Sequence, residues 1–300
     1  MDGILNIYKE KGFTSHDVVA VVRRTLHMKK VGHTGTLDPD AEGVLPICVG
    51  RGTKLADIIM DGRKSYRAVL HLGITTTTED ASGEIVEEKP VVFDEGKIRE
   101  TINTFIGELE QIPPMYSAVK INGKKLYQLA REGKEIERKA RKITVYDIKI
   151  RRFISPCQVE MDVDCSKGTY IRTLCADIGK ALGCGGHMAS LLRTATGGFS
   201  LENAIKLHEL KLLEEAGQVE TVLLKLEDAL EGYTRVFVSE KSTKLLYNGG
   251  KIYKEFLQAD KELTDGQEIR VFDYQRNLIG IYTVVQEEKS FFIKPFKMLI

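Results

Sequence analysis

The chain of 300 residues is 42% hydrophobic and 29% charged, a composition that excludes disordered and collagen-like proteins. Its 44 Lys and Arg nearly balance 43 Asp and Glu, so the average charge gives no reason to expect a polyanionic partner. The five cysteines form no Cys-x-x-Cys pair, and no apolar run reaches the ~20 residues that span a bilayer. These features favour a reducing, cytoplasmic protein without a disulfide framework, a zinc site or membrane attachment.

The first half of the chain predicts a helix and a pair of strands. Thr14 or Ser15 can cap a helix that runs to about His27 and carries valines on one face. Alternating apolar residues over 142–153 and 157–165 predict two strands. The short turn between them favours an antiparallel pair.

Three more helices are predicted before the sequence changes character. They cover Thr169–Leu182, about 206–216 and about 220–231. Strands and helices do not alternate regularly along the chain. We therefore expect an α+β fold, with a mixed, largely antiparallel sheet flanked by helices, rather than a doubly wound parallel sheet.

From about Tyr233 onward the sequence consists of short β-rich segments separated by turn-like stretches. Roughly 65–70 residues of this kind predict a small all-β barrel, a size that can fold alone. We therefore expect two domains, residues 1–232 and 233–300. The β-rich segments are TRVFVS, QEIRVFDY, LIGIYTVV and SFFIKPF.

Charge is unevenly distributed along the chain. Residues 71–114 carry 3 basic and 10 acidic side chains, whereas residues 115–180 carry 15 basic and 8 acidic ones. The basic block is densest between Lys120 and Arg152. On charge alone a solvated surface is the commoner explanation of such a block, and contact with nucleic-acid phosphates is the alternative.

The most unusual stretch is residues 32–54, GHTGTLDPDAEGVLPICVGRGTK. Asp38 and Asp40 imitate the start of an EF-hand calcium loop, but Val49 stands where the bidentate Glu is required. The glycines near Lys54 lack the spacing of a phosphate-binding P-loop. An isolated Asp-Pro pair most often only starts a reverse turn. Neither a metal nor a nucleotide cofactor is therefore expected.

The same stretch resembles the catalytic motif of the TruB family of tRNA pseudouridine synthases, G-H-x-G-x-L-D-P-x-A-x-G-x-L. Other segments resemble this family in the expected order, and together they cover nearly all of residues 3–199. One departure is Glu10, which stands where the family usually has a proline, and it affects a turn rather than the chemistry. The further segments are GILNIYKEKGFTSHDVV, KSYRAVLHLGITTTTEDASGE, PPMYSAVKINGKKLY, KGTYIRTLCADIG and HMASLLRTATGGF.

The resemblance implies roles for three residues in catalysis. Pseudouridine formation breaks the C1′–N1 bond of uridine and rejoins the base through C5, without a metal or a redox cofactor. By resemblance the nucleophile is Asp38, with Asp40 as its competitor, and attack at C1′ or at C6 stays open. Arg172 matches the arginine that pairs with the nucleophile. Tyr66 matches the tyrosine that stacks on the target base and helps to remove the proton from C5.

Five more residues are matched to RNA binding in the same way. The target uridine must swing out of its folded loop to be reached. His33 resembles the histidine that fills the vacated space, and Leu191 closes the apolar side of the pocket. Asp80 and Tyr170 match positions near the flipped nucleotide, and Lys54 matches a contact to phosphate.

The implied partner is tRNA, and no obligate protein partner is expected. Residues 115–142 resemble a mobile arm that closes over the T-loop, and the C-terminal barrel resembles a PUA domain that touches the acceptor end. The expected activity is conversion of the T-loop uridine at position 55 into pseudouridine. Two alternatives stay open: a guide-RNA-dependent synthase of the box H/ACA type, and a non-catalytic RNA-binding or RNA-folding protein on the same fold.

Overall fold

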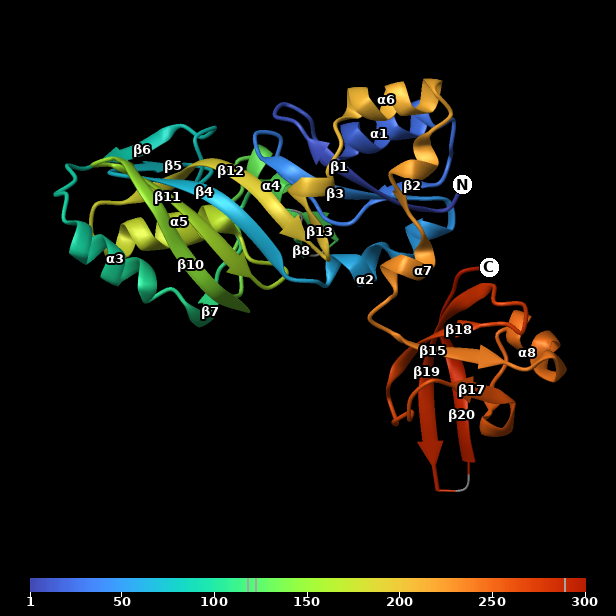
Figure 1. Ribbon diagram of the computed structural model, residues 1–300. Coiled ribbons are helices and arrows are strands. Elements are labelled where there is room, and N and C mark those ends of the chain that lie inside the picture. Colours follow the sequence, from blue (N-terminus) through green and yellow to red (C-terminus); the bar gives the residue numbers. More distant parts are fainter. Residues whose placement is uncertain (118, 122, 289) are drawn as a thin grey trace.

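The computed structural model describes residues 1–117, 119–121, 123–288 and 290–300, which form a large and a small sheet with helices around them (Figure 1). The strands of the large sheet are β1 (Gly3–Lys9), β2 (Val31–His33), β3 (Glu42–Val49), β4 (Lys64–Leu72), β7 (Gly107–Gln111), β10 (Arg141–Ser155), β11 (Gln158–Cys165), β12 (Gly186–Thr196), β13 (Phe199–Ser200) and β14 (Leu223–Leu224). Their order is β14-β1-β3-β12-β4-β11-β10-β7, with β2 paired to β3 and β13 to β12. Within the described ranges, every helix is too short or too polar to traverse a lipid bilayer.

One half of the large sheet is covered by α1 (Ser15–Thr25) and α6 (Leu207–Glu215), which lie side by side (Figure 1). The helix predicted from Thr14 is confirmed: the Thr14 side chain accepts a hydrogen bond from Asp17 N, and the Asp17 carboxylate accepts one from Thr14 N. The helix ends before His27, which adopts a left-handed φ of 52°. Val18 and Val22 are buried against β1 and β3, so the apolar face of α1 closes this part of the core.

The other half of the sheet packs against α3 (Glu95–Asn103) and α5 (Ile171–Ala181). The predicted antiparallel pair is confirmed as β10 and β11. The helix predicted over Thr169–Leu182 is confirmed as α5, which begins two residues later because Tyr170 is its extended N-cap residue. Alternate residues of β4 are buried, as expected for a strand with one face on the core.

The two halves meet where β12 pairs with β3. This short pairing is parallel, with Arg193 opposite Gly43, and it is the one parallel pairing among the described strands of the large sheet. A side chain at position 43 has no room, because a Cβ there would lie 2.2 Å from the carbonyl oxygen of Arg193 and φ is +106°. The α+β fold with a mixed, largely antiparallel sheet is therefore confirmed.

The prediction of a single helix over 220–231 is wrong, whereas the helix predicted over 206–216 is confirmed as α6. The region of the wrongly predicted helix forms the short helix η3 (Val219–Thr221), then β14, then α7 (Leu226–Ala229). Leu223 and Leu224 pair with Leu5 and Ile4 of β1, and Leu223 is buried. Strand pairing and burial at the sheet edge outweigh the helical periodicity of this segment.

The C-terminal part forms a second, barrel-like sheet with its own apolar core. The four predicted β-rich segments are confirmed, and the expected division between residues 232 and 233, which stays a proposal, falls between α7 and the first strand. The strands are β15 (Thr234–Val238), β16 (Ile252–Tyr253), β17 (Leu257–Ala259), β18 (Glu268–Phe272), β19 (Leu278–Glu287) and β20 (Ser290–Met298), in the order β16-β20-β19-β18-β15-β17.

The barrel is joined to the rest of the chain by apolar and charged contacts. Ile281 and Leu299 are fully buried in a cluster that also contains Ile4 and Leu55. At its edge the guanidinium of Arg51 donates to Leu299 O at 3.2 Å. This contact region therefore includes both the first strand and the last residues of the chain.

Short elements complete the described structure. They are α2 (Ala56–Met60), α4 (Leu126–Arg131) and α8 (Thr243–Tyr247); the hairpins β5 (Ile74–Thr76) with β6 (Ile85–Glu88) and β8 (Lys120–Ile121) with β9 (Lys124–Lys125); and the 3₁₀ helices η1 (Gly50–Leu55), η2 (Leu201–Asn203), η4 (Glu240–Ser242) and η5 (Lys254–Phe256).

Candidate active site

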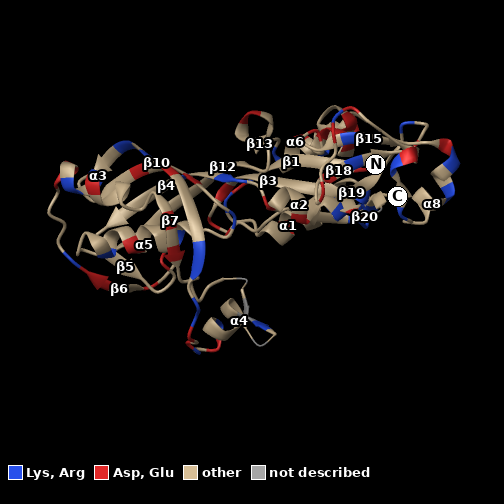
Figure 2. Cartoon of the chain, turned by 90° about the horizontal axis from the view of Figure 1, so that it is seen from below, with Lys and Arg blue, Asp and Glu red and all other residues tan. Residues whose placement is uncertain are grey.

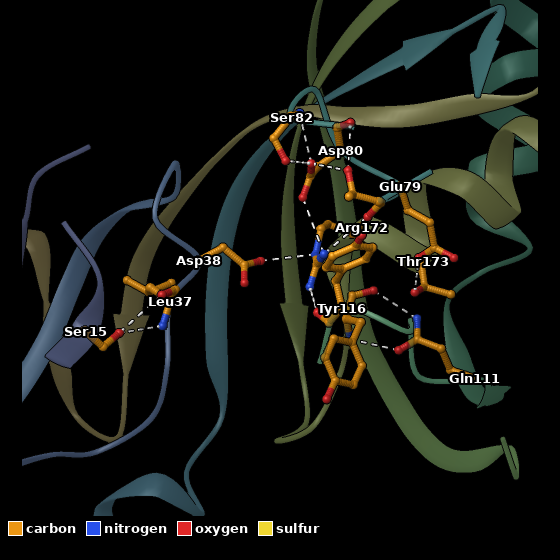
Figure 3. Close-up of polar contacts among 12 residues, drawn as sticks. Ser15, Leu37, Asp38, Glu79, Asp80, Ser82, Gln111, Tyr116, Arg172 and Thr173 are labelled. Atoms are coloured by element: carbon orange, nitrogen blue, oxygen red, sulfur yellow. Dashed lines mark hydrogen bonds and ion pairs between the residues drawn. The ribbon is translucent and has the colours of Figure 1, made fainter. Parts of the chain in front are cut away.

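Asp38 lies in the loop between β2 and β3, close to the junction of the two sheet halves. The Ser15 hydroxyl accepts a hydrogen bond from Leu37 N at 2.9 Å and donates one to Leu37 O at 3.2 Å (Figure 3). On the other side of Asp38, Pro39 O accepts a hydrogen bond from Gly12 N at 2.9 Å. The loop is therefore held to the start of α1 on both sides of the carboxylate.

A buried lysine also holds this loop through hydrogen bonds to backbone carbonyl groups. The Lys9 ammonium donates to the carbonyl oxygens of Phe13 at 2.6 Å, Pro39 at 3.0 Å and Glu10 at 3.2 Å. Burial lowers the pKa of Lys9 to about 8, although carboxylates including Asp38 act in the opposite direction. Lys9 was not predicted as a site residue, because a lysine at the end of a strand belongs to no motif.

Arg172 joins the candidate nucleophile to a second carboxylate (Figure 3). Its Nε lies 3.1 Å from Asp38 Oδ2, and its Nη1 lies 3.4 Å from Asp80 Oδ2. The guanidinium also donates to Thr78 O at 3.2 Å and to Tyr116 O at 2.7 Å. The structure thus brings the three predicted residues into direct contact, and the five-donor fork of an arginine is suited to four acceptors at once.

The two ends of the central ion pair differ in exposure. The Arg172 side chain is 6% exposed and that of Asp38 42% exposed, so protein encloses the carboxylate on most sides while one side stays open. Burial raises the pKa of Asp38 above its ordinary 3.8; Arg172 opposes this rise, and Asp80 adds to it. A partly desolvated carboxylate that a guanidinium orients, and that solvent or a ligand can reach, is suited to act as a nucleophile.

Asp80 is fixed by a tight turn of polar residues. Its Oδ1 accepts hydrogen bonds from the hydroxyls of Thr78 and Ser82, both at 2.6 Å (Figure 3). The preceding residue, Glu79, has a left-handed φ of 63° and accepts a hydrogen bond from the Thr173 hydroxyl at 2.5 Å. Burial raises the pKa of Glu79. Glu79 and Thr173 were not predicted, and an acidic residue preceding Asp80 was the only signal.

Tyr66 and Leu191 form the apolar side of the site. Tyr66 lies on β4 and is 7% exposed, and Leu191, on the adjacent β12, packs against the same buried cluster as Tyr66 and Leu37. Burial raises the pKa of Tyr66, Arg193 opposes the rise, and the charge of Asp38 adds to it. The predicted tyrosine and leucine therefore share one cluster with Leu37, the residue before Asp38.

Tyr170 is held at the start of α5 by Gln111. Gln111 Nε2 donates to Tyr170 O at 3.0 Å, and Tyr170 N donates to Gln111 Oε1 at 2.8 Å (Figure 3). This reciprocal pair fixes the backbone that carries Arg172 two residues later. Gln111 is 4% exposed and was not predicted, because its role depends on a contact between β7 and α5.

His33 ends β2 and is half-buried. Its Nδ1 accepts a hydrogen bond from Gly35 N at 3.3 Å, and its ring meets the ring of His16 edge-on at a centroid distance of 5.2 Å. Burial lowers the pKa of His33, and His16 lowers it further. His33 is therefore expected to be neutral near pH 7, a state that favours stacking against a base over contact with phosphate.

Two predicted residues lie outside this contact network. The Lys54 ammonium donates to Ile300 O at 2.9 Å, which places it at the contact between the large-sheet part of the chain and the barrel. Asp40 is exposed, and no described cation lies within 4.0 Å of its carboxylate. The competitor to Asp38 thus lacks the arginine partner, while Lys54 as a phosphate contact stays a prediction.

The predicted arm contains β8, β9 and α4, and Figure 2 shows α4 standing away from the body of the molecule. Among the side chains of the arm that the structure describes, most of the charged ones are exposed, and Lys134 lies 2.7 Å from Glu132. Arg138 donates to Pro113 O at 3.1 Å, and Tyr116, at the base of the arm, contacts Arg172. The carbonyl group of Tyr116 therefore connects the base of the arm to the carboxylate network.

The comparisons with known proteins agree with this arrangement. A model of the TruB family pseudouridylate synthase N-terminal domain matches residues 23–171, and a model of the tRNA pseudouridylate synthase B C-terminal domain matches residues 172–231. Proteins named tRNA pseudouridine synthase B are similar over nearly their whole length. The one from Alkaliphilus oremlandii is 51% identical, over 100% of this chain and 99% of the relative. The one from Staphylococcus saprophyticus is 45% identical, over 99% of each.

Solved structures support the fold independently. A chain in an H/ACA RNP bound to a substrate RNA containing 2′-deoxyuridine superposes with a TM-score of 0.75 at 25% identity, over 99% of this chain and 85% of the other. A chain in a Cbf5-Nop10-Gar1 complex gives a TM-score of 0.76 at 27% identity, with coverages of 99% and 85%. Because family models match residues 23–231 and relatives named tRNA pseudouridine synthase B are 45–51% identical over almost the full chain, the chain belongs to the TruB family of pseudouridine synthases.

Proposed function

We propose that this chain converts the T-loop uridine at position 55 of tRNA into pseudouridine, with Asp38 as the nucleophile. The observation that carries the proposal is the ion pair between the accessible Asp38 carboxylate and the buried Arg172 guanidinium, 3.1 Å apart. Relatives named tRNA pseudouridine synthase B, at 45–51% identity over almost the full chain, support tRNA as the substrate. The reaction is an isomerisation, because the same atoms are rejoined through a different bond.

In this mechanism Asp38 bonds transiently to the substrate, at C1′ of the ribose or at C6 of the base. The carboxylate must be ionised to attack, and Arg172 supplies the positive charge that favours the ionised form. Asp80 holds the guanidinium from its other side. The C1′–N1 bond breaks and the base turns. If Asp38 is bonded to C1′, C5 displaces its carboxylate from that carbon; if Asp38 is bonded to C6, that bond breaks after C5 has bonded to C1′. In both cases the carboxylate is restored.

The base pocket is formed by Tyr66, Leu191 and the buried cluster around them. A uridine swung out of its loop would place its ring against these two side chains, and His33 would fill the space that the base leaves. Tyr66, in its phenolate form, would also receive the proton that leaves C5. The base would then be held by apolar contact, and the chemistry would be carried by Asp38 and Tyr66.

The remaining RNA contacts are assigned to three parts of the chain. The arm at 115–142 would contact T-loop phosphates, Asp80 and Tyr170 would lie near the flipped nucleotide, and the barrel would contact the acceptor end. Phosphate contacts of this kind position an RNA without reading its bases. Recognition would then come from the shape of one folded loop and from the flipped uridine.

A test of the proposed activity uses the purified protein and a tRNA transcript with no other component. We expect pseudouridine at position 55 within minutes, and none in a transcript with cytidine at that position. Mapping modified bases by chemical derivatisation and reverse transcription identifies the product. A requirement for a guide RNA or for other proteins would instead favour the guide-dependent type, whose solved structures share this fold at 25–27% identity.

The rate should fall on the acid side at a higher pH than an ordinary aspartate would require. Because burial raises the pKa of Asp38 above 3.8, its carboxylate becomes protonated as pH falls through that raised value, and the protonated group cannot attack. Single-turnover rates across pH 3–8, on protein checked for folding by circular dichroism at each pH, measure this limb. Since Asp40 also raises the pKa of Asp38, Asp40→Asn should move the limb to lower pH. A limb centred at or below 3.8 would contradict the assignment.

A further inference from the structure

Arg193 is a fully buried arginine beside the site. It lies on β12 and is 1% exposed, the largest of the fully buried side chains. Its Nε donates to Val44 O at 2.7 Å, but its Nη2 is buried without a hydrogen-bond partner among the described residues. No described carboxylate lies within 4.0 Å of the guanidinium. A buried charge without a partner is costly, so its position calls for an explanation beyond packing.

Arg193 lies next to Tyr66 in the sheet. Arg193 pairs with Tyr66 across strands β12 and β4, and its Nη1 lies 3.8 Å from the position of a Cβ at Gly35, in the loop that leads to Asp38. It is close enough for its charge to act on the Tyr66 phenol. The buried cation therefore lies on the strand next to the phenol of the proposed pocket.

We propose that Arg193 is a positioning residue for Tyr66: it holds the phenol in the base pocket and supplies the positive charge that stabilises the phenolate. The inference rests on the proposed function. In the step it supports, the C5–H bond breaks, its electron pair stays with the ring, and the proton goes to the phenolate oxygen. Tyr66 is then a neutral phenol and returns the proton to solvent before the next turnover.

The other groups around Tyr66 do not supply that charge. Asp38 and Cys165 both act to keep the phenol protonated, as does burial, and Arg193 is the group that acts against them. The cations near Arg193 are Lys9, which is hydrogen-bonded to carbonyl groups, and Lys64, which donates to Met60 O at 2.7 Å. Without Arg193, a higher pH would be needed for the same fraction of phenolate.

The test compares Arg193→Met and Arg193→Lys with the unaltered chain. Met is similar in length and apolar, so it leaves no new buried charge. At pH 7.5 we expect Arg193→Met to lower the single-turnover rate about 10²-fold, the scale of general-base catalysis, and the affinity for tRNA less than about threefold. This loss should stay about the same from pH 7 to about 9, because Tyr66 is mostly protonated over this range in both proteins, and Arg193→Lys, which keeps the charge, should lose only about tenfold.

A second measurement does not depend on activity. In protein labelled with ¹³C at tyrosine Cζ, the Tyr66 signal, assigned by its absence in Tyr66→Phe, should titrate at a higher pH in Arg193→Met. An unchanged titration would overturn the inference. If Arg193→Met does not fold, Arg193→Gln, which also removes the charge, takes its place in the titration test. Failure here with an active unaltered chain affects Arg193 alone, whereas an inactive unaltered chain refutes the proposed function.

Discussion

Replacing Asp38 by Asn should abolish pseudouridine formation in tRNA. The amide keeps the size and most hydrogen bonds of the carboxylate but cannot form and release a covalent bond to the substrate. We expect the single-turnover rate to fall at least about 10⁴-fold, the order of loss when a covalent nucleophile is removed. Mapping pseudouridine in a transcript incubated with excess enzyme measures the loss even when the remaining rate is very low.

The matched control is Asp40→Asn, which makes the same chemical change two residues away on an exposed side chain. We expect its rate at pH 7.5 to stay within about threefold of the unaltered chain. Asp38→Asn should also unfold at no lower temperature at that pH. The folded-state pKa of Asp38 is raised, so its ionised form disfavours folding above that pKa and the uncharged amide removes this cost. An active Asp38→Asn, or an inactive Asp40→Asn with normal folding, would reverse the assignment of the nucleophile.

Arg172→Lys should be the second most damaging conservative change. The guanidinium contacts Asp38, Asp80 and two carbonyl oxygens at once, at 2.7–3.4 Å. A lysine ammonium offers three donors from one point and cannot span these acceptors. We expect the rate to fall at least about 10²-fold, with a smaller change in tRNA affinity, because the lost interaction orients and charges the nucleophile.

The control for this change is Arg99→Lys on α3. Arg99 is exposed and lies 2.7 Å from Glu95 one helical turn away, so the substitution keeps a surface ion pair of little energetic weight. Its activity should stay within about twofold of the unaltered chain. A rate for Arg172→Lys within tenfold of normal would show that charge alone, without the fork geometry, is enough at this position.

Local sequence signals predicted the elements whose stability is local. The cap at Thr14 and the alternation in β10 and β11 depend on residues a few positions apart, and the structure contains the predicted helix and hairpin. The segment at 220–231 was predicted as one helix because its periodicity is helical. Its strand β14 forms only because β1, more than two hundred residues earlier, offers a free edge.

The site was predicted to the extent that its residues lie in recognisable motifs. Asp38, Tyr66, Asp80 and Arg172 each stand in a segment with a characteristic pattern, and three of them are in direct contact. Residues such as Gln111 and Lys9 have no pattern of their own. Their contacts are between elements far apart in the chain, or to backbone oxygens that any sequence would supply, and so only the folded structure identifies them.

The attachment of the barrel limits the RNAs that fit the protein. A shared apolar cluster and an ion pair between Lys297 and Asp57 join the barrel to the large-sheet part of the chain. If the barrel binds one end of an RNA while Asp38 contacts a nucleotide of a loop, the two points of contact are separated by a fixed distance. An RNA would then reach both contacts only if the distance between its loop and its end matched this span. An RNA with a shorter or longer distance could make one contact but not both.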